Sequence, residues 1–310
     1  MLYKSFGKLG WPVSAVGLGA WNIGNQWGDI DDVTAWSTVR AAYDAGMTLF
    51  DVAESYGFPN GLSEMRVGHA LTGIRHNVIL VSKIGNWGQR TGGAIPKTGV
   101  DSIRISGHAI LGRLRTDWVD VVLCHKGDLG DPTVFLEGFE ALKDEGCLRA
   151  YGISTNDLDV LKRFNREGTC SVVQVDYSLL NRAPEGEFLP YCQEHGIAVM
   201  VRGPLAKGLL SGRYAQGSVF TDSVRASWNE GGAQQDQFEA RAEQVGRLSE
   251  VVSPGEEMVQ AAIRYTFTHP AVSVSIPGAK SPAQAQTNAA AGSRALTDAE
   301  AASLREAIGG

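Results

Sequence analysis

Eight short runs rich in Val, Ile and Leu recur along the whole chain, and stretches with helical periodicity separate them. This alternation is typical of repeated βα units around a parallel sheet. Most runs are almost continuously hydrophobic, as expected of strands that are buried on both faces. The predicted strands are Ser14–Leu18, Thr48–Asp51, Val78–Lys83, Val119–His125, Ala150–Ser154, Ser171–Asp176, Ile197–Arg202 and Ala271–Ile276. Eight such strands predict an α/β fold closed into a (β/α)8 TIM barrel.

The segments between the runs carry the signals of helix ends. Asp31 precedes a periodic apolar stretch that stops at Gly46, which matches an N-cap and a glycine stop. A last short helix is expected over Thr297–Ile308. We found no internal repeat or interdomain linker, so residues 1–310 are predicted to form a single barrel domain.

Two segments fall outside the βα pattern. Leu2–Phe6 and Val13–Gly17 flank a glycine-containing turn, which predicts an N-terminal β-hairpin that closes the bottom of the barrel. The stretch from about Tyr214 to Gln237 is polar and far longer than the roughly 2 to 6 residues of an ordinary βα loop. It is predicted to be either a functional lid or a mobile excursion.

Composition excludes several classes of protein. The formal net charge is −6, so no basic field exists to attract nucleic acid or anionic membrane. No run of apolar residues is long enough for a membrane span. The four cysteines form no CxxC pair, which favours reduced thiols in the cytoplasm over a zinc knuckle or a disulfide framework. We therefore expect a small-molecule partner and a monomer or small homo-oligomer.

Known motifs of other enzyme classes are missing. The sequence contains no HExxH, GxSxG or Walker loop, and no sequence cluster of metal ligands, so no metal is expected. The segment Gly17–Asn22 lacks the third glycine of the Rossmann fingerprint. A nucleotide, if bound, would therefore be bound in another way.

Ionisable residues end three of the predicted strands. Asp51, Lys83 and His125 close their runs, and Tyr56 follows Asp51 by five residues. Taken singly, such an Asp is often a helix N-cap, such a Lys often reaches to water, and a lone His is more often structural. In a (β/α)8 barrel, however, all of these positions face one mouth. Together they indicate a site for proton transfer, because the Lys83 ammonium would make the neighbouring Tyr56 phenol a stronger acid.

At these residues the sequence resembles the aldo-keto reductase family. Segments that resemble the family's motifs, in the family's order, are 49–57, 81–83, 119–125, 149–154, 174–182, 203–212 and 276–282. The resemblance implies an NADP(H)-dependent oxidoreductase that interconverts aldehydes or ketones, including sugar carbonyls, and alcohols. It also implies a catalytic tetrad of Asp51, Tyr56, Lys83 and His125, in which Tyr56 is the general acid and His125 orients the substrate oxygen.

The resemblance also implies cofactor contacts. Ser154 and Gln174 match residues that bond the nicotinamide carboxamide, and Arg202 stands where an aromatic ring commonly stacks beneath the nicotinamide. The other expected contacts, from the pyrophosphate to the adenosine phosphate, are Pro204, Leu205, Ala206, Gly208, Arg213, Gly278, Lys280, Gln284 and Asn288. The last three recur every four residues and so share one face of a helix. Lys280 is the candidate for a 2′-phosphate, which would favour NADP over NAD.

The substrate pocket is the least defined part of the site. Trp21 follows the first predicted strand, Trp87 follows Lys83 by four residues, and Trp27 lies in the first loop. These indoles can wall the mouth, although packing under a loop is an equally good interpretation of each. The alternative function is that of an NADPH-binding regulatory subunit with little turnover, resembling the potassium-channel β subunits.

Overall fold

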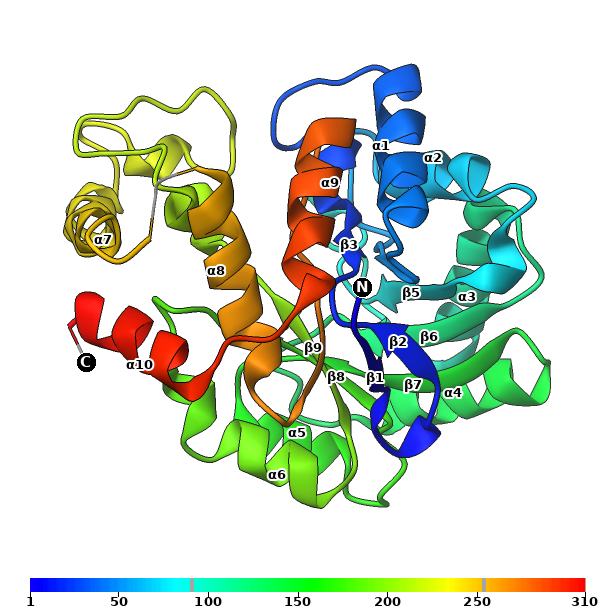
Figure 1. The fold of residues 1–310 in the computed structure, drawn as a ribbon. Helices are drawn as coiled ribbons and strands as arrows, with labels where there is room; N and C mark the ends of the chain where they lie inside the picture. Colours follow the sequence, from blue (N-terminus) through cyan, green and yellow to red (C-terminus); the bar gives the residue numbers. More distant parts are fainter. Residues whose placement is uncertain (90–91, 253–254, 310) are drawn as a thin grey trace.

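The computed structural model describes residues 1–89, 92–252 and 255–309 (Figure 1). Within these residues, a parallel sheet contains eight strands in the order in which they follow along the chain. The strands are β3 (Leu18–Gly19), β4 (Leu49–Asp51), β5 (Ile79–Ile84), β6 (Val119–Cys124), β7 (Leu148–Ser154), β8 (Val172–Asp176), β9 (Ala198–Arg202) and β10 (Val272–Ser275). Parallel bridges from Val16 to Ser275 and from Gly19 to Gly278 join the first strand to the last. The sheet therefore closes into the predicted barrel.

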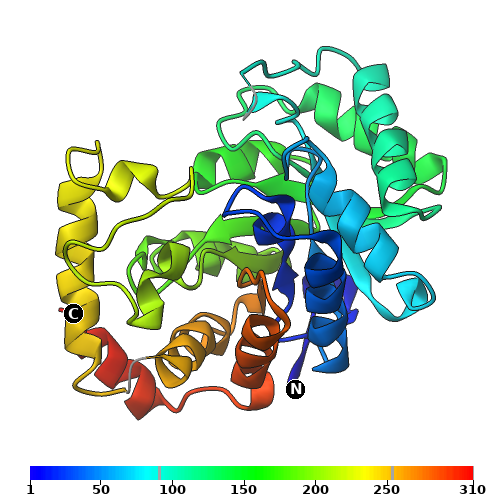
Figure 2. The same ribbon diagram turned by 90° about the horizontal axis from the view of Figure 1, so that it is seen from above.

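Helices surround the sheet (Figures 1 and 2). They are α1 (Asp32–Asp44), α2 (Leu62–Ala70), α3 (Val100–Leu114), α4 (Thr133–Asp144), α5 (Leu158–Phe164), α6 (Phe188–Glu194), α7 (Gln235–Leu248), α8 (Glu256–Thr268), α9 (Pro282–Ala290) and α10 (Asp298–Ala307). The Asp31 carboxylate caps α1 by accepting from the Thr34 N–H, and Gly46 takes the left-handed conformation beyond its end. Both helix ends were predicted correctly. None of the helices in the described ranges is long and apolar enough to cross a membrane.

The interior of the barrel is filled by apolar side chains rather than by a channel. Leu49, Val81, Val121 and Met200 belong to one buried cluster that the strands enclose. The outward side chains of the same strands pack under the helices in a second cluster. Because both faces are buried, the strands read as continuous hydrophobic runs.

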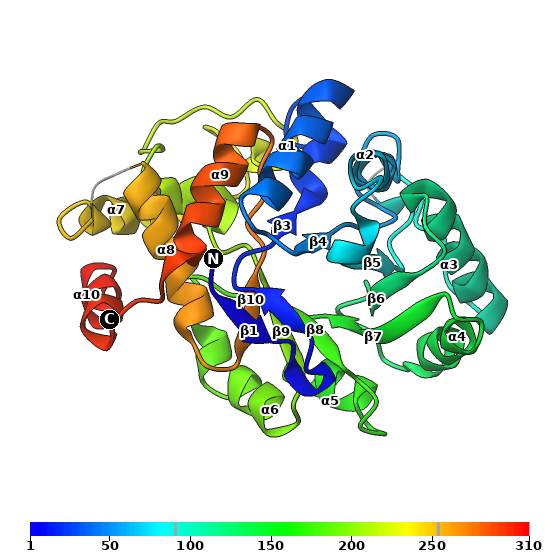
Figure 3. The same ribbon diagram turned by 45° about the vertical axis from the view of Figure 1, so that its right-hand side comes forward.

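The hairpin consists of β1 (Tyr3–Ser5) and β2 (Pro12–Ser14), which pair antiparallel. Phe6 and Val13 are fully buried in the interior cluster, and the Lys8 N–H donates to the Gly196 carbonyl just before β9. Figure 3 shows the hairpin against β9 and β10. It therefore covers the end of the barrel at which the strands begin.

The boundaries of the first strands differ from the prediction. The predicted run Ser14–Leu18 is divided, because Ser14 ends β2 and the barrel strand begins only at Leu18. The Ser14 hydroxyl donates to the Val16 carbonyl at 2.8 Å and accepts from the Thr48 N–H, also at 2.8 Å. These hydrogen bonds support a change of direction that a hydrophobic pattern does not reveal.

The segment from Tyr214 to α7 packs on itself and on the loop after β3. Aromatic rings pack in a cluster formed by Tyr214, Phe220, Trp228 and Phe238. The Ser223 hydroxyl donates to the Gln26 carbonyl at 3.3 Å, and the Arg225 guanidinium lies 5.5 Å from the centre of the Trp27 ring. From above, α7 lies at the outer edge of the molecule beside α10 (Figure 2).

Candidate active site

Three neighbouring strands bring their polar ends to one mouth. Asp51 is the last residue of β4, Lys83 is the penultimate residue of β5, and His125 directly follows β6. Tyr56 lies in the turn after β4, where its N–H bonds the Ala53 carbonyl and its own carbonyl accepts from the Ser63 N–H. These backbone bonds fix the turn between β4 and α2.

Lys83 and Asp51 form a buried ion pair. The Lys83 Nζ lies 2.7 Å from both Asp51 carboxylate oxygens and 2.8 Å from the Val52 carbonyl oxygen, so all three of its donors are used. The Lys83 side chain is completely buried and that of Asp51 nearly so. Burial raises the pKa of the Asp51 carboxyl, and the adjacent ammonium of Lys83 opposes that rise. The lysine is therefore held in one position.

Tyr56 lies between this ion pair and His125. The Lys83 Nζ is 4.6 Å from the centre of the phenol ring. The His125 ring meets the phenol edge to face with 5.9 Å between ring centres. The structure thus gathers the four predicted tetrad residues, while their catalytic roles stay predictions.

Gln174 contacts the ion pair, and Ser154 is its neighbour on the adjacent strand. Their backbones are opposite each other in the β7–β8 pairing, and both side chains are buried. The Gln174 amide donates to Asp51 Oδ1 at 2.9 Å. Gln174 therefore connects the tetrad with the predicted nicotinamide contacts, a link that the sequence did not indicate.

Arg202 is held by two residues that the sequence analysis missed. Its guanidinium donates to Asn156 Oδ1 at 2.9 Å and lies 3.8 Å from the Asp176 carboxylate. Asp176 ends β8 and Asn156 follows β7, so the strand-end rule could have found both. The side chain of Arg202 is 39% exposed, which leaves it accessible from the mouth.

The predicted pyrophosphate segment makes a tight left-handed turn. Pro204 and Leu205 lead into η6 (Ala206–Ser211), and Ala206, Lys207 and Gly208 all have positive φ values. Successive backbone N–H groups in such conformations form an anion-binding concavity. Arg213 lies beyond the turn and is exposed.

The predicted adenosine contacts gather at the start of α9. Gln284 Oε1 accepts from the Lys280 N–H at 3.0 Å, and the Asn288 amide donates to the Gly278 carbonyl at 3.1 Å. The Lys280 Nζ donates to the Trp27 carbonyl at 3.0 Å. Lys280 is therefore not an ordinary exposed lysine, because it ties α9 to the loop after β3.

The tryptophans occupy two different places. The Trp21 ring stacks on Tyr56 with 5.9 Å between ring centres, and Trp27 meets Trp21 edge to face. The Trp21 indole N–H donates to Gln26 Oε1. Trp87 instead lies under the Arg113 guanidinium, 5.0 Å from the ring centre. It lines a cavity of about 300 Å³ with Glu54 and residues of α3.

Glu54 is a further residue that sequence reasoning missed. Its Oε1 accepts from the N–H groups of Gly85 at 2.7 Å and Trp87 at 3.2 Å. Its Oε2 lies 3.7 Å from the Lys97 Nζ. The side chain is almost fully buried, and it anchors the segment that follows Lys83. Its place between Asp51 and Tyr56 in segment 49–57 was the available signal.

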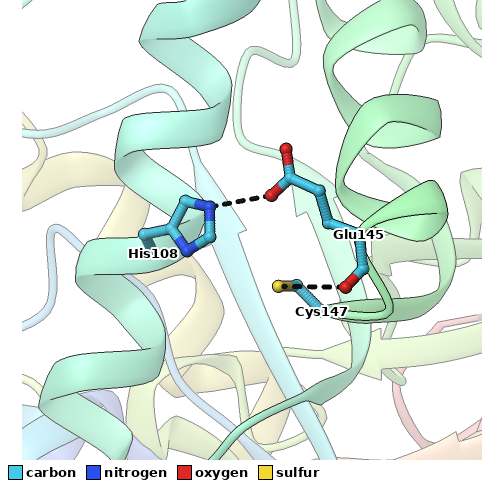
Figure 4. A group of neighbouring side chains, drawn as sticks. All are labelled: His108, Glu145 and Cys147. Atoms are coloured by element: carbon cyan, nitrogen blue, oxygen red, sulfur yellow. Dashed lines mark hydrogen bonds and ion pairs between the residues drawn. The ribbon is translucent and has the colours of Figure 1, made fainter.

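A possible metal-ligand group lies elsewhere on the described part of the chain. It consists of His108, Glu145 and Cys147 (Figure 4). The cluster could not be read from the sequence, because His108 and Glu145 are 37 residues apart.

The Aldo/keto reductase family model matches residues 15–308. Among curated proteins, the NADH-specific methylglyoxal reductase of Escherichia coli is 31% identical, with 95% of this chain and 94% of that protein covered. A probable voltage-gated potassium channel subunit beta of rice, Oryza sativa subsp. japonica, is 33% identical over 90% of this chain and 87% of that protein.

Solved structures agree with these matches. The holo form of the Bacillus halodurans aldo-keto reductase AKR11C1 has a TM-score of 0.83 and 30% identity, with 99% of this chain and 96% of that chain covered. A Klebsiella pneumoniae aldo/keto reductase in complex with NADP and acetate has a TM-score of 0.71 and 29% identity, covering 97% of this chain and 93% of that chain.

Proposed function

Because this chain belongs to the aldo/keto reductase family, we propose that it moves hydride between NADP(H) and a small aldehyde, ketone or sugar carbonyl. The observation that carries the proposal is the packing of Tyr56 between the Lys83–Asp51 ion pair and His125. The family consists of oxidoreductases, and its tetrad residue types all occur here at one mouth.

The residues around the mouth fit a nicotinamide dinucleotide. Ser154 and Gln174 offer a hydroxyl and an amide beside the tetrad. The left-handed turn at 206–208 offers backbone N–H groups for a pyrophosphate, and Lys280 offers an ammonium for a phosphate. Two further buried donors, Gln26 Nε2 and Trp27 Nε1, have no hydrogen-bond partner among the described residues. When bound, the cofactor supplies or accepts the hydride.

Tyr56 is proposed to protonate the carbonyl oxygen as negative charge develops there. The Lys83 ammonium lies against the phenol ring and stabilises the phenolate left after proton transfer. Asp51 acts through Lys83, because it fixes the position of the ammonium, and Gln174 in turn holds the Asp51 carboxylate. In the oxidative direction the same phenolate takes the proton from the alcohol.

His125 and Trp21 are proposed to position the substrate. The imidazole lies edge-on to the phenol, where it can donate to the carbonyl oxygen and set its angle. The Trp21 indole stacks on the phenol and forms an apolar wall that helps to exclude water. Trp87 is proposed to act from farther out, through the loop that Glu54 anchors.

The substitution Tyr56→Phe tests the proposal. Carbonyl reduction by NADPH should fall by about 10²- to 10⁴-fold, because the proton donor is lost. NADPH binding, followed by cofactor fluorescence, should be retained. The matched control is Tyr43→Phe, since Tyr43 lies in α1 and bonds Asn77 away from the mouth. If Tyr56→Phe kept the turnover of the parent protein, the phenol would not be the acid.

The second candidate function is a nucleotide-binding regulatory subunit with little turnover. It is favoured by the likeness to the rice potassium channel subunit beta. Turnover of the purified protein on a panel of aldehydes, ketones and sugars separates the two functions. A regulatory subunit would bind NADPH tightly and leave every compound of the panel almost unchanged.

A further inference from the structure

A cluster of three side chains lies on the outer face of the barrel, away from the mouth. His108 belongs to α3, Glu145 is the C-cap of α4, and Cys147 directly precedes β7. Figure 4 shows the imidazole directed at the carboxylate, and the thiol close to both and bonded to the Glu145 carbonyl oxygen. The ligand atoms that the three side chains offer all lie within 4.8 Å of one another. We propose that His108, Glu145 and Cys147 form a binding site for a Zn²⁺ ion.

The donor set suits zinc. Imidazole nitrogen, thiolate sulfur and carboxylate oxygen are its usual protein ligands, and three of them with one water complete a tetrahedron. With bonds of about 2.0 to 2.3 Å, the ligand atoms of such a site lie roughly 3.3 to 3.7 Å apart. His108 Nε2 and Glu145 Oε2 are now 2.8 Å apart. None of the three residues is buried, so small rotations of the His108 and Cys147 side chains can make this adjustment.

A neighbouring arginine orients the carboxylate. The Arg104 Nε donates to Glu145 Oε1 at 2.6 Å, which leaves Oε2 directed at His108. Arg104 also bonds the Asp101 carboxylate at 2.9 Å. Hydrogen bonds of this kind from outside the ligand set fix ligating carboxylates in metal sites. The charge is balanced as well, because Zn²⁺ and Arg104 oppose Glu145, Asp101 and the Cys147 thiolate.

Binding would convert the thiol to a thiolate and release its proton to solvent. Cys147 is suited to this reaction because it is only partly covered, whereas the other three cysteines of the chain are buried. The same difference makes Cys147 a specific reporter, since a thiol reagent should reach it first in the folded protein.

The site would connect α3, α4 and the beginning of β7. The Cys147 carbonyl accepts from the Val119 N–H at 2.9 Å, where β6 begins. The tetrad lies at the opposite end of the barrel, where β4, β5 and β6 end. Zinc is therefore expected to stabilise the fold without entering the reaction. The zinc site and the proposed oxidoreductase function are thus independent, and an experiment can disprove either one while the other stands.

The test uses the full chain, zinc chloride and a thiol-reactive dye. We expect one thiol to react quickly in the metal-free protein and one equivalent of Zn²⁺ to slow that reaction at least tenfold. Cobalt(II), a spectroscopic substitute for zinc, should produce a thiolate-to-metal charge-transfer band. Zinc should also raise the melting temperature, and carbonyl reduction should be unchanged when the thiol is protected.

Variants identify the ligands. Cys147→Ser should lose the cobalt band, and His108→Gln should weaken zinc protection of the thiol by tenfold or more. His195→Gln is the matched control, because His195 is an exposed histidine at the end of α6. The proposal is overturned if the folded parent protein shows neither thiol protection nor the cobalt band. It is equally overturned if His195→Gln weakens protection as much as His108→Gln does.

Discussion

Glu54 shows how one buried carboxylate can order the surroundings of Lys83, the lysine of the predicted tetrad. It accepts two backbone N–H groups from the segment that follows Lys83. One of them belongs to Gly85, which has a φ of 137° and lies against the His125 backbone. Glu54 is therefore a positioning residue, because it acts through the loop that lies between two tetrad positions.

Glu54→Gln should raise the KM for carbonyl substrates several-fold while leaving kcat and NADPH affinity close to those of the parent protein. The amide keeps the shape but loses the charge-assisted bonds, which are worth about 1.5 to 3 kcal/mol. Steady-state kinetics measure KM and kcat separately, and cofactor fluorescence measures the NADPH affinity. Glu137→Gln, an exposed change on α4, is the control. Equal losses in kcat and NADPH affinity would instead indicate general damage to the fold.

Lys280 sets the expected choice between the two nicotinamide dinucleotides. If its ammonium binds the 2′-phosphate, Lys280→Ala should weaken NADPH binding by about 10- to 100-fold and NADH binding much less. The E. coli relative is an NADH-specific enzyme by name, so the ratio of the NADPH and NADH affinities is the quantity that tests Lys280. Titrations with both cofactors decide it, and Lys143→Ala on α4 is the control. Equal losses for NADPH and NADH would remove the phosphate assignment.

At the scale of elements, Glu64 joins α2 to β5 and α3. Its carboxylate accepts from the Ser82 hydroxyl and the Arg113 Nε, each at 2.5 Å. The side chain is fully buried. Burial raises the pKa of Glu64 from its ordinary 4.5 to about 7, although Arg113 and Ser82 act in the opposite direction. Between pH 4.5 and about 7, Glu64 therefore keeps its proton in the folded protein and has lost it in the unfolded chain.

This difference predicts a pH dependence of stability. The contribution of Glu64 is fully present below pH 4.5 and is lost as pH rises to about 7, since the folded state then binds no extra proton. Urea unfolding across this range should show the free energy of unfolding falling more steeply in the parent protein than in Glu64→Gln. The prediction is contradicted if the free energy of unfolding changes with pH in the same way in the parent protein and in Glu64→Gln. Glu137→Gln should follow the parent curve.

The sequence predicted elements best where burial alone decides them. Continuous apolar runs such as β6 and β9 were placed within one residue of their observed ends, because both faces of those strands are covered. The division of the first run at Ser14 was missed, since side-chain hydrogen bonds rather than hydrophobicity turn the chain there.

At the scale of the whole molecule, the predicted tetrad came together because parallel strands all end at one mouth. Contacts between side chains of different helices and strands could not be predicted from strand ends. The Glu64–Arg113 pair, the Gln174–Asp51 bond and the His108 cluster each join residues dozens of positions apart. Closure of the barrel brings such residues together, and no local pattern records the contact.

The long segment before α7 also belongs to this scale. Its aromatic residues pack on one another as part of the cluster under the helices, and Ser223 and Arg225 in this segment contact Gln26 and Trp27 in the first loop. Lys280, just before α9, donates to the Trp27 carbonyl in the same loop. Three parts of the chain that are far apart in sequence therefore meet around Trp27, beside the predicted adenosine contacts.

The hairpin has a practical consequence for handling the protein. Phe6 and Val13 fill the end of the barrel opposite the mouth. The Leu2 N–H also donates to the Gly292 carbonyl at 2.6 Å, so the first residues are held at that end. Tethering the molecule to a bead or an electrode through Met1 would turn the strand ends that carry Asp51 and Lys83 away from the support. Reagents in the surrounding liquid would then approach the protein from the side of the predicted catalytic residues.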